Sequence, residues 1–386
     1  MPVSVLFVNG TSERGGADTD LLGVCQGLSE LGVQPIVALP ALGPLSRAFV
    51  DARCTVHYLD SAPVKRVRGI ADVVSLVARV ATAVVTLLSL LRRLRPDIIH
   101  VNSATIPAAA WAGRLAGVPV VWHLREIELI TRSRVFAMLL FASLRLCADR
   151  IVAISGAVRD TLPPDLRART VVIHHGVDTA TYCWPSPGTS ARARFGLRDA
   201  DRVIGFVGRL SPIKGIDVLI DALNILREND HSTRLLIVGP ELGYADHVAE
   251  LRARVDRLSF GDHVVFAGEV AGGADLAQVY WAIDALVLPT LVPEGLGLVL
   301  LEALACGIPV VATNHGGPVE ILRDCAAARM VPPGDPPALA AALADLLPRS
   351  RDLAPIAREY AVERFGLERP AAALHALYLE ILVERA

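Results

Sequence analysis

The sequence has few of the features that mark nucleic-acid-binding, zinc-binding or secreted proteins. Its 386 residues carry a formal net charge of −2 without a block of Lys and Arg, so we expect no nucleic-acid partner. The six cysteines are scattered, with no C-x-x-C pair and no Cys/His cluster of zinc spacing. The N-terminus is not typical of a signal peptide, because a short apolar strand runs directly into N-G-T-S-E-R-G-G. We therefore expect reduced thiols and a cytoplasmic protein.

The first strand–helix loop also lacks the G-x-G-x-x-G fingerprint of dinucleotide-binding proteins. The loop reads N-G-T-S-E-R-G-G, which does not match that spacing. An NAD-dependent oxidoreductase is therefore a distant alternative.

One apolar segment, residues 70–91, approaches the length of a membrane span. Only Asp72 and Arg79 are charged within it. Arg79 would lie near the bilayer centre, at a cost of roughly 2.5–3.5 kcal/mol. We expect a crossover helix packed on a sheet. Peripheral contact with the inner face of the membrane stays open for this helix and for the apolar residues 135–147.

The length and the strand pattern predict two α/β domains. A chain of this size is long for one core. Both residues 3–8 and residues 202–207 form an apolar strand, followed by a turn rich in small residues and then a helix. Further apolar strands alternate with helices after each opening, which is typical of parallel sheets covered on both faces. The expected strands are 35–39, 55–59, 98–102, 118–123, 150–154 and 171–174 in the first half, and 235–239, 264–268, 285–289 and 309–313 in the second.

A Pro/Ser/Gly-rich linker, C-W-P-S-P-G-T-S, begins at Cys183 and separates the two halves. We therefore expect domains over residues 1–183 and 184–365. In such folds ligands bind beyond the carboxyl ends of the strands.

The most informative stretch is residues 287–314, which predicts strand, Gly-rich turn, helix and strand. Its helix is apolar all round except for Glu302, and Glu294 stands at the start of the turn. Gly295 and Gly297 would let backbone amides approach a ligand at a helix N-terminus, which favours an anion. Two carboxylates for hydroxyls and an amide cradle for phosphate suit a nucleotide sugar. The alternative is a solvated Glu294 and an internal hydrogen bond for Glu302.

The second half opens with G-R-L-S-P-I-K-G, which places Arg209 and Lys214 on one loop between a strand and a helix. A diphosphate there would meet two cations and backbone amides without needing a metal. Two solvated cations are the alternative.

The first half offers weaker signals for a site. Gly15 and Gly16 occupy its first strand–helix turn, where Asp18 could instead form an ordinary cap. His123, Arg125 and Glu126 follow an apolar strand as W-H-L-R-E, which favours a role at the site for these three side chains. H-H-G-V-D at residues 174–178 fits a turn equally well.

The order of these motifs resembles a known family. They run G-G-A-D, W-H-L-R-E, A-D-R-I-V-A-I-S, H-G-V-D, G-R-L-S-P-I-K-G, E-G-L-G-L-V-L-L-E-A-L-A-C-G-I-P-V-V-A-T and G-G-P-V-E. Over essentially its whole length the chain is similar to the retaining glycosyltransferases of family 4 (glycosyl transferases group 1). The resemblance implies the GT-B fold, in which two Rossmann-like domains face each other across a cleft. It also implies that a C-terminal helix, residues 366–386, packs back on the first domain.

The resemblance implies a role for each matching residue. Arg209 and Lys214 would hold the donor diphosphate, and Glu302 would bind the ribose. Glu294 would contact the sugar hydroxyls. Gly16 would approach the phosphates, His123 would lie beside the transferred sugar, and the backbone of Val270 would meet the base. Backbone amides would surround sugar and phosphate at Gly295, Leu296, Gly297, Leu298 and Val299. The expected catalytic group is His123, Arg209, Lys214 and Glu294, with Arg125 and Glu126 as candidates on the acceptor side.

The family's chemistry implies transfer of a hexose-type sugar from a nucleoside diphosphate sugar to a hydroxyl of a glycan, lipid or small molecule. The anomeric configuration would be retained by front-face departure, with neither a metal nor a further cofactor. Asp18 departs from the Glu that is commoner at that position in the family. A nucleotide-sugar epimerase and a non-catalytic carbohydrate-binding protein are the alternatives, and the second would predict loss of Arg209, Lys214 or Glu302, which are all present.

Overall fold

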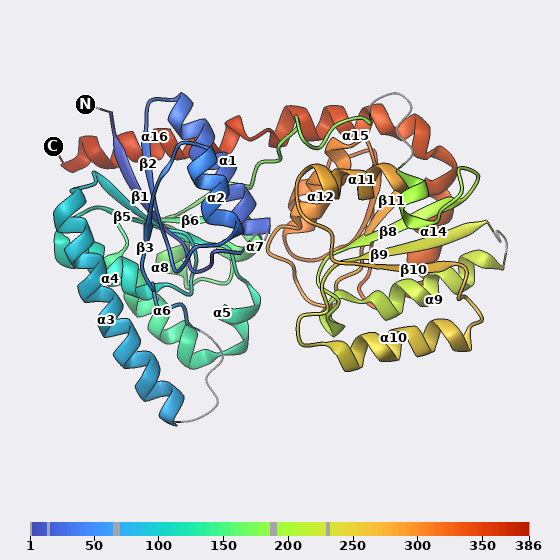
Figure 1. Cartoon of the computed structure of the whole chain (residues 1–386), viewed down its shortest axis with the longest axis horizontal. Coiled ribbons are helices and arrows are strands. Elements are labelled where there is room, and N and C mark those ends of the chain that lie inside the picture. The colour runs from blue at the N-terminus through green and yellow to red at the C-terminus, as the bar shows by residue number, and fades with distance from the viewer. Residues whose placement is uncertain (1, 14–15, 65–69, 186–190, 229–231, 386) are drawn as a thin grey trace. The chain divides into compact units, whose positions relative to one another are not determined.

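The chain folds into two compact α/β units. The computed structural model describes residues 2–13, 16–64, 70–185, 191–228 and 232–385. One unit consists of Met1–Gly176 and Leu367–Ala386, and the other of Val177–Gly366 (Figure 1). Each contains one parallel sheet with helices packed against it, as the alternating strand and helix patterns predict.

The second unit begins earlier than the linker composition suggests. Val177 donates its backbone amide to the Phe365 carbonyl at 2.7 Å and pairs with Gly366. Further on, the Cys183 carbonyl accepts the indole N–H of Trp281 at 2.7 Å. Backbone pairing thus holds the segment between Val177 and Cys183 to the second unit, whereas the predicted boundary assigned it to the first.

The sheet of the first unit has seven parallel strands in the order β3-β2-β1-β4-β5-β6-β7. Its chain order reverses at β1, which lies between β2 and β4. The strands are β1 (Ser4–Val8), β2 (Gln34–Leu39), β3 (Thr55–Tyr58), β4 (Ile98–Val101), β5 (Val120–Leu124), β6 (Arg150–Ala153) and β7 (Thr170–Val172). The helices are α1 (Gly16–Glu30), α2 (Pro44–Asp51), α3 (Ile70–Leu94), α4 (Pro107–Ala116), α5 (Glu128–Arg132), α6 (Arg134–Cys147), α7 (Gly156–Arg159), α8 (Pro164–Arg167) and α16 (Glu368–Arg385).

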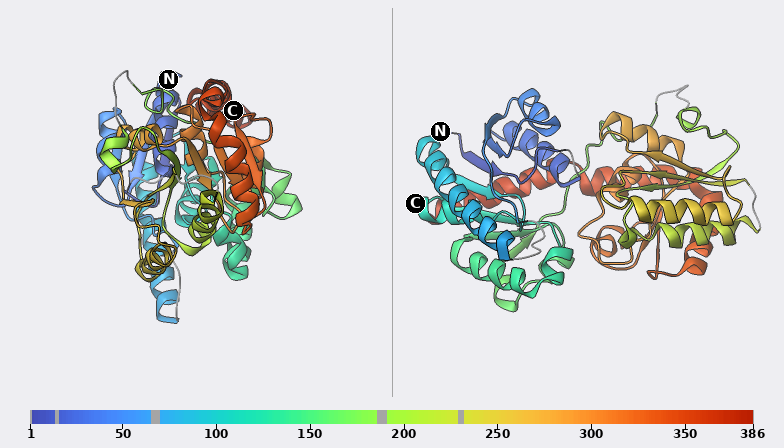
Figure 2. Two further views of the ribbon diagram at one scale, coloured as in Figure 1. Left: turned by 90° about the vertical axis from the view of Figure 1, so that its right-hand side faces the viewer. Right: turned by 60° about the horizontal axis from the view of Figure 1, so that its bottom comes forward.

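Helix α16 returns from the end of the chain to the core of the first unit, as the resemblance implied. It packs beside α1 (Figures 1 and 2). Its inward side chains share one buried cluster with β1 and α1. These side chains are Ala371, Leu374, Leu377, Tyr378 and Ile381. Burial of this apolar stripe anchors the helix to the first unit.

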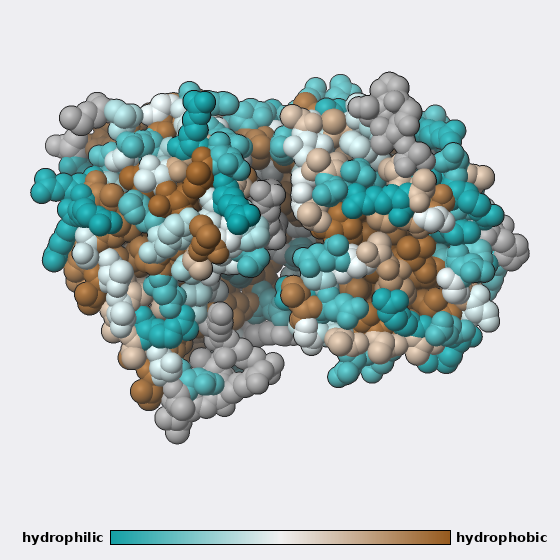
Figure 3. Space-filling view, in the orientation of Figure 1, coloured by the Kyte–Doolittle hydropathy of each residue, from teal (hydrophilic) through white to brown (hydrophobic). Residues whose placement is uncertain are grey.

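Helix α3 connects β3 to β4 and packs against α4, so it is a crossover helix as expected. Its buried residues lie in its second half, at Ala83, Leu87, Leu90 and Leu91. Val74, Val77 and Val85 are exposed, and Figure 3 shows hydrophobic residues along the helix. Within the described residues, Val74–Leu94 is the one stretch long and apolar enough to cross a membrane, with 22% of the window buried.

The sheet of the second unit repeats the same order with six parallel strands, β10-β9-β8-β11-β12-β13. Here the chain order reverses at β8, between β9 and β11. The strands are β8 (Arg202–Val207), β9 (Thr233–Val238), β10 (Val264–Gly268), β11 (Ala285–Leu288), β12 (Val310–Thr313) and β13 (Ala328–Val331). The helices are α9 (Ile216–Arg227), α10 (Ala245–Arg257), α11 (Ala274–Ala282), α12 (Leu298–Ala305), α13 (Gly317–Leu322), α14 (Pro336–Leu346) and α15 (Ser350–Phe365), with single 3-10 turns η1 (Arg192–Phe195), η2 (Pro212–Lys214) and η3 (Leu347–Arg349).

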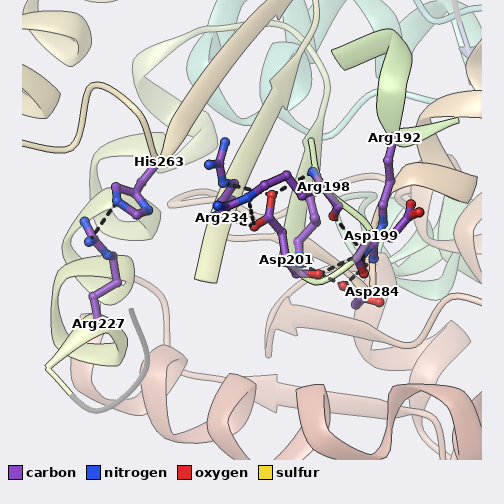
Figure 4. Close-up of polar contacts among 9 residues, drawn as sticks. Arg192, Arg198, Asp199, Asp201, Arg227, Arg234, His263 and Asp284 are labelled. Atoms are coloured by element: carbon purple, nitrogen blue, oxygen red, sulfur yellow. Dashed lines mark hydrogen bonds and ion pairs between the residues drawn. The ribbon is translucent and has the colours of Figure 1, made fainter. Parts of the chain in front are cut away.

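Arginine–aspartate pairs fill the amino-terminal edge of this sheet (Figure 4). Asp284 accepts from Arg192 at 2.7 Å and from the backbone amide of Val203 at 2.8 Å. Asp201 pairs with Arg198 at 3.0 Å and with Arg234 at 2.9 Å. These contacts join the segments before β8 and β11 to β9. The opposite, carboxyl-terminal edge carries the loops with the predicted site residues.

Candidate functional site

The candidate donor site lies where the order of the second sheet reverses, beyond the carboxyl ends of β8 and β11. Such a switch point is where open α/β sheets bind ligands. Two loops meet there, because the amide of Leu291 donates to the carbonyl of Ile213 at 2.8 Å. Gly215 makes this approach feasible, since its φ is +66° and a Cβ would lie 2.1 Å from the Pro289 carbonyl oxygen. Glycine is therefore required at this contact.

Lys214 and Glu294 form an ion pair across these two loops. The Lys214 Nζ lies 2.6 Å from the Glu294 Oε2, with the side chains 17% and 27% exposed. Glu294 is therefore paired and partly buried, contrary to the alternative of a solvated side chain. An ammonium has three donors, so Lys214 can bind an anion while keeping this contact.

Arg209 lies on the same loop as Lys214 in a different environment. It lies two residues after β8 and is exposed, and its guanidinium has no partner among the described residues. The predicted pair of cations therefore consists of one lysine that is already oriented and one arginine that is free to meet a ligand.

The Gly-rich turn before α12 is held by a third loop, which follows β12. Glu294 bridges to Gly316, and its carbonyl accepts the amide of Gly317 at 2.9 Å. A Cβ on Gly316, whose φ is +70°, would lie 2.4 Å from the Glu294 carbonyl oxygen. The G-G of G-G-P-V-E thus allows the backbones of the two loops to come together.

Helix α12 begins at the end of this turn, at the predicted position. Gly297 precedes it with a φ of +89°, and Leu298 and Val299 are its first, half-buried residues. The first amides of a helix have no intrahelical acceptor, and the helix dipole makes this end positive. The turn from Gly295 to Val299 therefore has the properties of an anion site.

Glu302 lies one turn further along α12 and is buried. It accepts a hydrogen bond from the Tyr280 hydroxyl at 2.6 Å, and the Tyr182 hydroxyl is also nearby. Burial raises the pKa of Glu302 from its ordinary value, while the two phenols oppose the rise. The internal hydrogen bond weighed as an alternative is therefore present. Neither Tyr280 nor Tyr182 was predicted from the sequence.

Val270 follows β10 on the same edge of the sheet and is half-buried. Its predicted contact with the base stays a prediction.

A further polar group supports the turn beside Glu294, where the Nε2 of His315 donates to the Thr290 carbonyl at 2.9 Å.

In the first unit, His123 lies on β5 within a buried chain of polar side chains. Its Nδ1 is 3.2 Å from the Nε2 of His100 on β4, and the Nδ1 of His100 is 2.7 Å from the hydroxyl of Tyr378 on α16. The Nε2 of His123 is buried and has no partner among the described residues. Burial lowers the pKa of His100 to about 3 and that of His123 well below its usual value, and the nearby Arg125 lowers both further. Both rings are therefore neutral.

Arg125 lies at the centre of a second buried network. It forms an ion pair with Asp20 at 2.9 Å, with both side chains almost fully buried. It also donates to Asn102 Oδ1 at 2.8 Å and contacts the Nε2 of His175. These partners occupy the guanidinium, so Arg125 orders the ends of β4 and β5. Its predicted contact with an acceptor stays a prediction.

Glu126 is engaged in local contacts. Its carboxylate accepts from the hydroxyl of Ser103 and from the backbone amides of Ala104 and Arg125, the last two at 3.1 Å. It thus fixes the loop after β4, and its acceptor-side role likewise stays a prediction.

Gly16 is the first residue of α1, whereas Arg14 and Gly15 lie outside the described residues, as does the side chain of Asp18.

Two of the residues that were missed lie in or beside the sequence motifs. Asp20 lies two residues beyond the Asp18 of G-G-A-D. His175 belongs to H-H-G-V-D, which we interpreted equally as a turn. Asp178 of that motif does form a turn, accepting the amide of Ala180 at 3.0 Å. Among the described residues no three His, Cys, Asp or Glu side chains gather in a way that could hold a metal ion.

Two family models match the chain. The model described as Glycosyltransferase Family 4 matches residues 14–181. The model described as Glycosyl transferases group 1 matches residues 201–349. The chain belongs to the group 1, family 4 glycosyltransferases. The resemblance seen in the motif order is thereby confirmed.

Curated relatives of this glycosyltransferase bear the name D-inositol 3-phosphate glycosyltransferase. That of Salinispora tropica is 36% identical over 257 residues, or 61% of this chain and 52% of the relative. That of Kineococcus radiotolerans is 38% identical over 259 residues, or 62% and 59%. The chain spans about half the length of the curated relatives it matches.

Solved structures confirm the predicted GT-B fold. The crystal structure of Anabaena Alr3699/HepE in complex with UDP and glucose has a TM-score of 0.80 at 26% identity, covering 97% of this chain and 98% of that chain. Sucrose-phosphate synthase from Thermosynechococcus elongatus has a TM-score of 0.80 at 21% identity, covering 99% and 100%, and shows the fold alone. Neither the epimerase nor the non-catalytic alternative is favoured by these relatives.

Proposed function

We propose that this glycosyltransferase moves a hexose-type sugar, with retention and without a metal, from a nucleoside diphosphate sugar to a hydroxyl acceptor. The observation that carries the proposal is the Lys214–Glu294 pair, which joins the loop that carries the exposed Arg209 to the Gly-rich turn that precedes α12. The Anabaena relative, whose crystal structures hold UDP or UDP-glucose, supports a nucleotide sugar as donor. The name of the curated relatives supports a hydroxylated acceptor.

Arg209, Lys214 and the first amides of α12 bind the donor diphosphate in this proposal. Two cations and a helix N-terminus neutralise a diphosphate without a divalent ion. Glu294 accepts hydrogen bonds from the sugar hydroxyls while Lys214 holds it in place. The remaining donor contacts follow the family: Glu302 to the ribose, Gly16 to the phosphates and the Val270 backbone to the base.

Glu302 suits the ribose because it is a buried acceptor that the Tyr280 phenol holds in place. Hydroxyl groups donate well to an ionised carboxylate, and such bonds are stronger than neutral ones. Tyr280 uses part of the acceptor capacity of Glu302, and an ionised carboxylate has about four lone-pair sites. Ribose hydroxyls can therefore bind without displacing the tyrosine.

The transfer step proceeds on one face of the sugar. The bond between the anomeric carbon and the β-phosphate oxygen breaks, and its electron pair leaves with the diphosphate. The acceptor oxygen forms the new bond on the same face, and its proton passes to the departing phosphate oxygen. Arg209 and Lys214 stabilise the negative charge that develops there. His123 lies beside the transferred sugar.

Peripheral membrane contact is a separate proposal, and it rests on the apolar surfaces of α3 and α6. Val74, Val77 and Val85 on α3 are exposed, as are Val135, Met138, Leu139 and Leu146 on α6. Exposed Arg92, Arg93 and Arg134 add positive charge to the same helices, which suits an anionic lipid surface. The lipid would be reached from the cytoplasmic side.

Vesicle sedimentation tests this contact. The wild type should sediment with phosphatidylcholine vesicles that contain phosphatidylglycerol, and V77D/V85D should not. Leu242→Asp serves as control, because it changes an equally exposed residue in the second unit. Equal sedimentation of all three proteins would contradict the proposal.

The release of nucleoside diphosphate tests the catalytic proposal. The chain is incubated in EDTA with UDP-, GDP-, ADP- and dTDP-sugars and a panel of alcohol acceptors. We expect release that depends on the acceptor, with one donor preferred and the product retaining the anomeric configuration by NMR. An inverted product, or a modified sugar released without acceptor, would refute it.

A further inference from the structure

The C-terminal helix supplies a side chain that is connected to the predicted sugar-facing histidine. Tyr378 on α16 reaches His100 on β4, and His100 reaches His123 on β5. The contacts are 2.7 Å and 3.2 Å, and all three side chains are at most 2% exposed. Figures 1 and 2 show α16 against the first unit, although it is separated from β4 by the whole second unit in sequence.

We propose that Tyr378 and His100 are positioning residues, which fix the proton of His123 on Nε2 so that His123 donates a hydrogen bond to an oxygen of the transferred sugar. This inference rests on the proposed function for the identity of the ligand. The direction of the hydrogen-bond chain follows from the side chains alone.

The chain of hydrogen bonds begins at the phenol. Among the described residues the hydroxyl of Tyr378 has one hydrogen-bond partner, the Nδ1 of His100. If this hydroxyl accepted instead of donating, its own hydrogen would be buried without an acceptor, which is costly. Tyr378 therefore donates, and the Nδ1 of His100 accepts.

The tautomer of each histidine follows from this direction. A neutral imidazole carries one proton, and the hydrogen bond at one nitrogen decides which nitrogen holds it. His100 accepts at Nδ1, so its proton is on Nε2, and it donates to the Nδ1 of His123. The proton of His123 must then be on Nε2. Burial of both rings and the nearby Arg125 keep them neutral.

The series of hydrogen bonds ends at the buried Nε2 of His123, which has no partner among the described residues. An unpaired N–H donor is rare in a protein interior, so it points to an acceptor supplied by a ligand. If every hydrogen bond in the series ran in the opposite direction, both the phenol hydrogen of Tyr378 and the Nε2 lone pair of His123 would be unpaired. The inferred direction therefore leaves one group unpaired rather than two, and a sugar hydroxyl or ring oxygen can accept from it.

The ring of His100 is also held in place by packing. Phe7 on β1 lies against it with ring centroids 4.9 Å apart, and Tyr378 meets it edge-on at 85°. A ring fixed in this way cannot rotate to exchange its two nitrogens without disturbing the core. Because the His100 ring is fixed, the hydrogen bond from Tyr378 on α16 determines which nitrogen of His123 on β5 carries the proton.

Nitrogen NMR of histidine-labelled protein tests the inference. The 15N shifts of a neutral ring distinguish the protonated from the unprotonated nitrogen, and His123→Asn identifies the His123 signals. We expect the intact wild-type chain to show His123 protonated on Nε2. In Tyr378→Phe we expect both tautomers of His123, and a rate of sugar transfer lower by roughly 3- to 10-fold, as for the loss of one hydrogen bond.

Tyr360→Phe is the matched control, because it removes the hydroxyl of a half-buried tyrosine in the second unit, which donates to the Ile321 carbonyl at 2.8 Å. It should leave the His123 signals unchanged. A wild-type His123 protonated on Nδ1, or an unchanged tautomer in Tyr378→Phe, would overturn the inference. The wild-type spectrum needs neither a variant nor turnover, so this result is distinguishable from a failure of the proposed function, which would appear as absent sugar transfer.

Discussion

The ammonium of Lys214 lies 2.6 Å from a carboxylate oxygen of Glu294, although 80 residues separate the two in sequence. The loops after β8 and β11 bring them together because those strands are neighbours in the sheet. A lysine held in this way loses less side-chain entropy when a diphosphate binds. The pair therefore pre-organises the group that is expected to face the leaving phosphate.

Replacing Lys214 should weaken diphosphate binding. Lys214→Ala removes a charge-assisted bond and leaves Glu294 facing the phosphate with an uncompensated charge. We expect affinity for the preferred nucleoside diphosphate to fall by roughly 10- to 100-fold by calorimetry. Arg351→Ala is the control, since Arg351 is an exposed cation on α15. Equal affinity in wild type and Lys214→Ala would show that this loop does not hold the phosphates.

Gly215→Ala should be much more disruptive than Gly196→Ala. The two glycines have nearly the same φ, +66° and +67°, so both substitutions cost left-handed strain of roughly 1–2 kcal/mol. At Gly196 a Cβ meets nothing within 4 Å, whereas at Gly215 it lies 2.1 Å from a backbone oxygen. Urea unfolding should therefore show a larger loss of stability for Gly215→Ala, with donor binding lost as well. Similar losses for both variants would contradict the close contact of the two loops.

Glu302 should make the second unit less stable as the pH rises. Its pKa is raised by burial, so the unfolded chain ionises first as the pH passes the ordinary value of 4.5. Stability is therefore lost between that value and the raised folded pKa. Tyr182, Tyr280 and Cys306 face Glu302 and remain neutral in this window, because burial raises their pKa values.

The variant Glu302→Gln separates the effect of ionising the carboxyl from that of packing, because glutamine has nearly the same shape and does not titrate. Its stability relative to wild type should increase with pH above 4.5 and then level off, as measured by urea unfolding across a pH series. Its affinity for the nucleotide should fall, because the ribose loses a charged acceptor. A relative stability that does not vary with pH would mean that the carboxyl is not destabilised by burial.

The buried histidines should destabilise the first unit in acid. Burial lowers the pKa of His175 to about 4, against an ordinary value of 6.5, even though Asp20 opposes the shift. The unfolded chain therefore takes up a proton first as the pH falls below 6.5, and stability is lost down to the folded pKa. At pH 5 the loss for this residue is about 2 kcal/mol.

His175→Gln should reduce that loss. A glutamine can still accept from Arg125, and it does not titrate. We expect unfolding free energies of variant and wild type to converge as the pH falls from 7.5 to 5, by about 2 kcal/mol. Asp20, Arg125 and His174 also face His175, so the measurement uses the difference between the two proteins. A constant difference would contradict a neutral, buried His175.

Most of the elements and the donor loops could be predicted from the sequence. Parallel strands buried on both faces give continuous apolar runs, so β8 and β10 have the predicted bounds, residues 202–207 and 264–268. Strand β13, with the sequence A-R-M-V, was missed because it is short and carries Arg329, whose charge is satisfied by Asp345 at 2.8 Å. Local patterns do not reveal such a distant partner.

The networks behind the site residues could not be predicted, for the same reason. Tyr280 meets Glu302, and Tyr378 meets His100, only after the sheet and helices have packed. Nothing in the local sequence of α16 distinguishes Tyr378 from the other apolar residues of its buried stripe. Motifs predict which residues face a ligand, whereas the structure is needed to identify what orients them.

The binding of nucleoside diphosphates in EDTA tests the central claim most directly. The intact chain is titrated with UDP, GDP, ADP and dTDP, and its unfolding temperature is recorded with and without magnesium. The account predicts a rise with one nucleotide that is independent of magnesium and is lost in Lys214→Ala. No rise with any of the four, or a rise that requires magnesium, would contradict it.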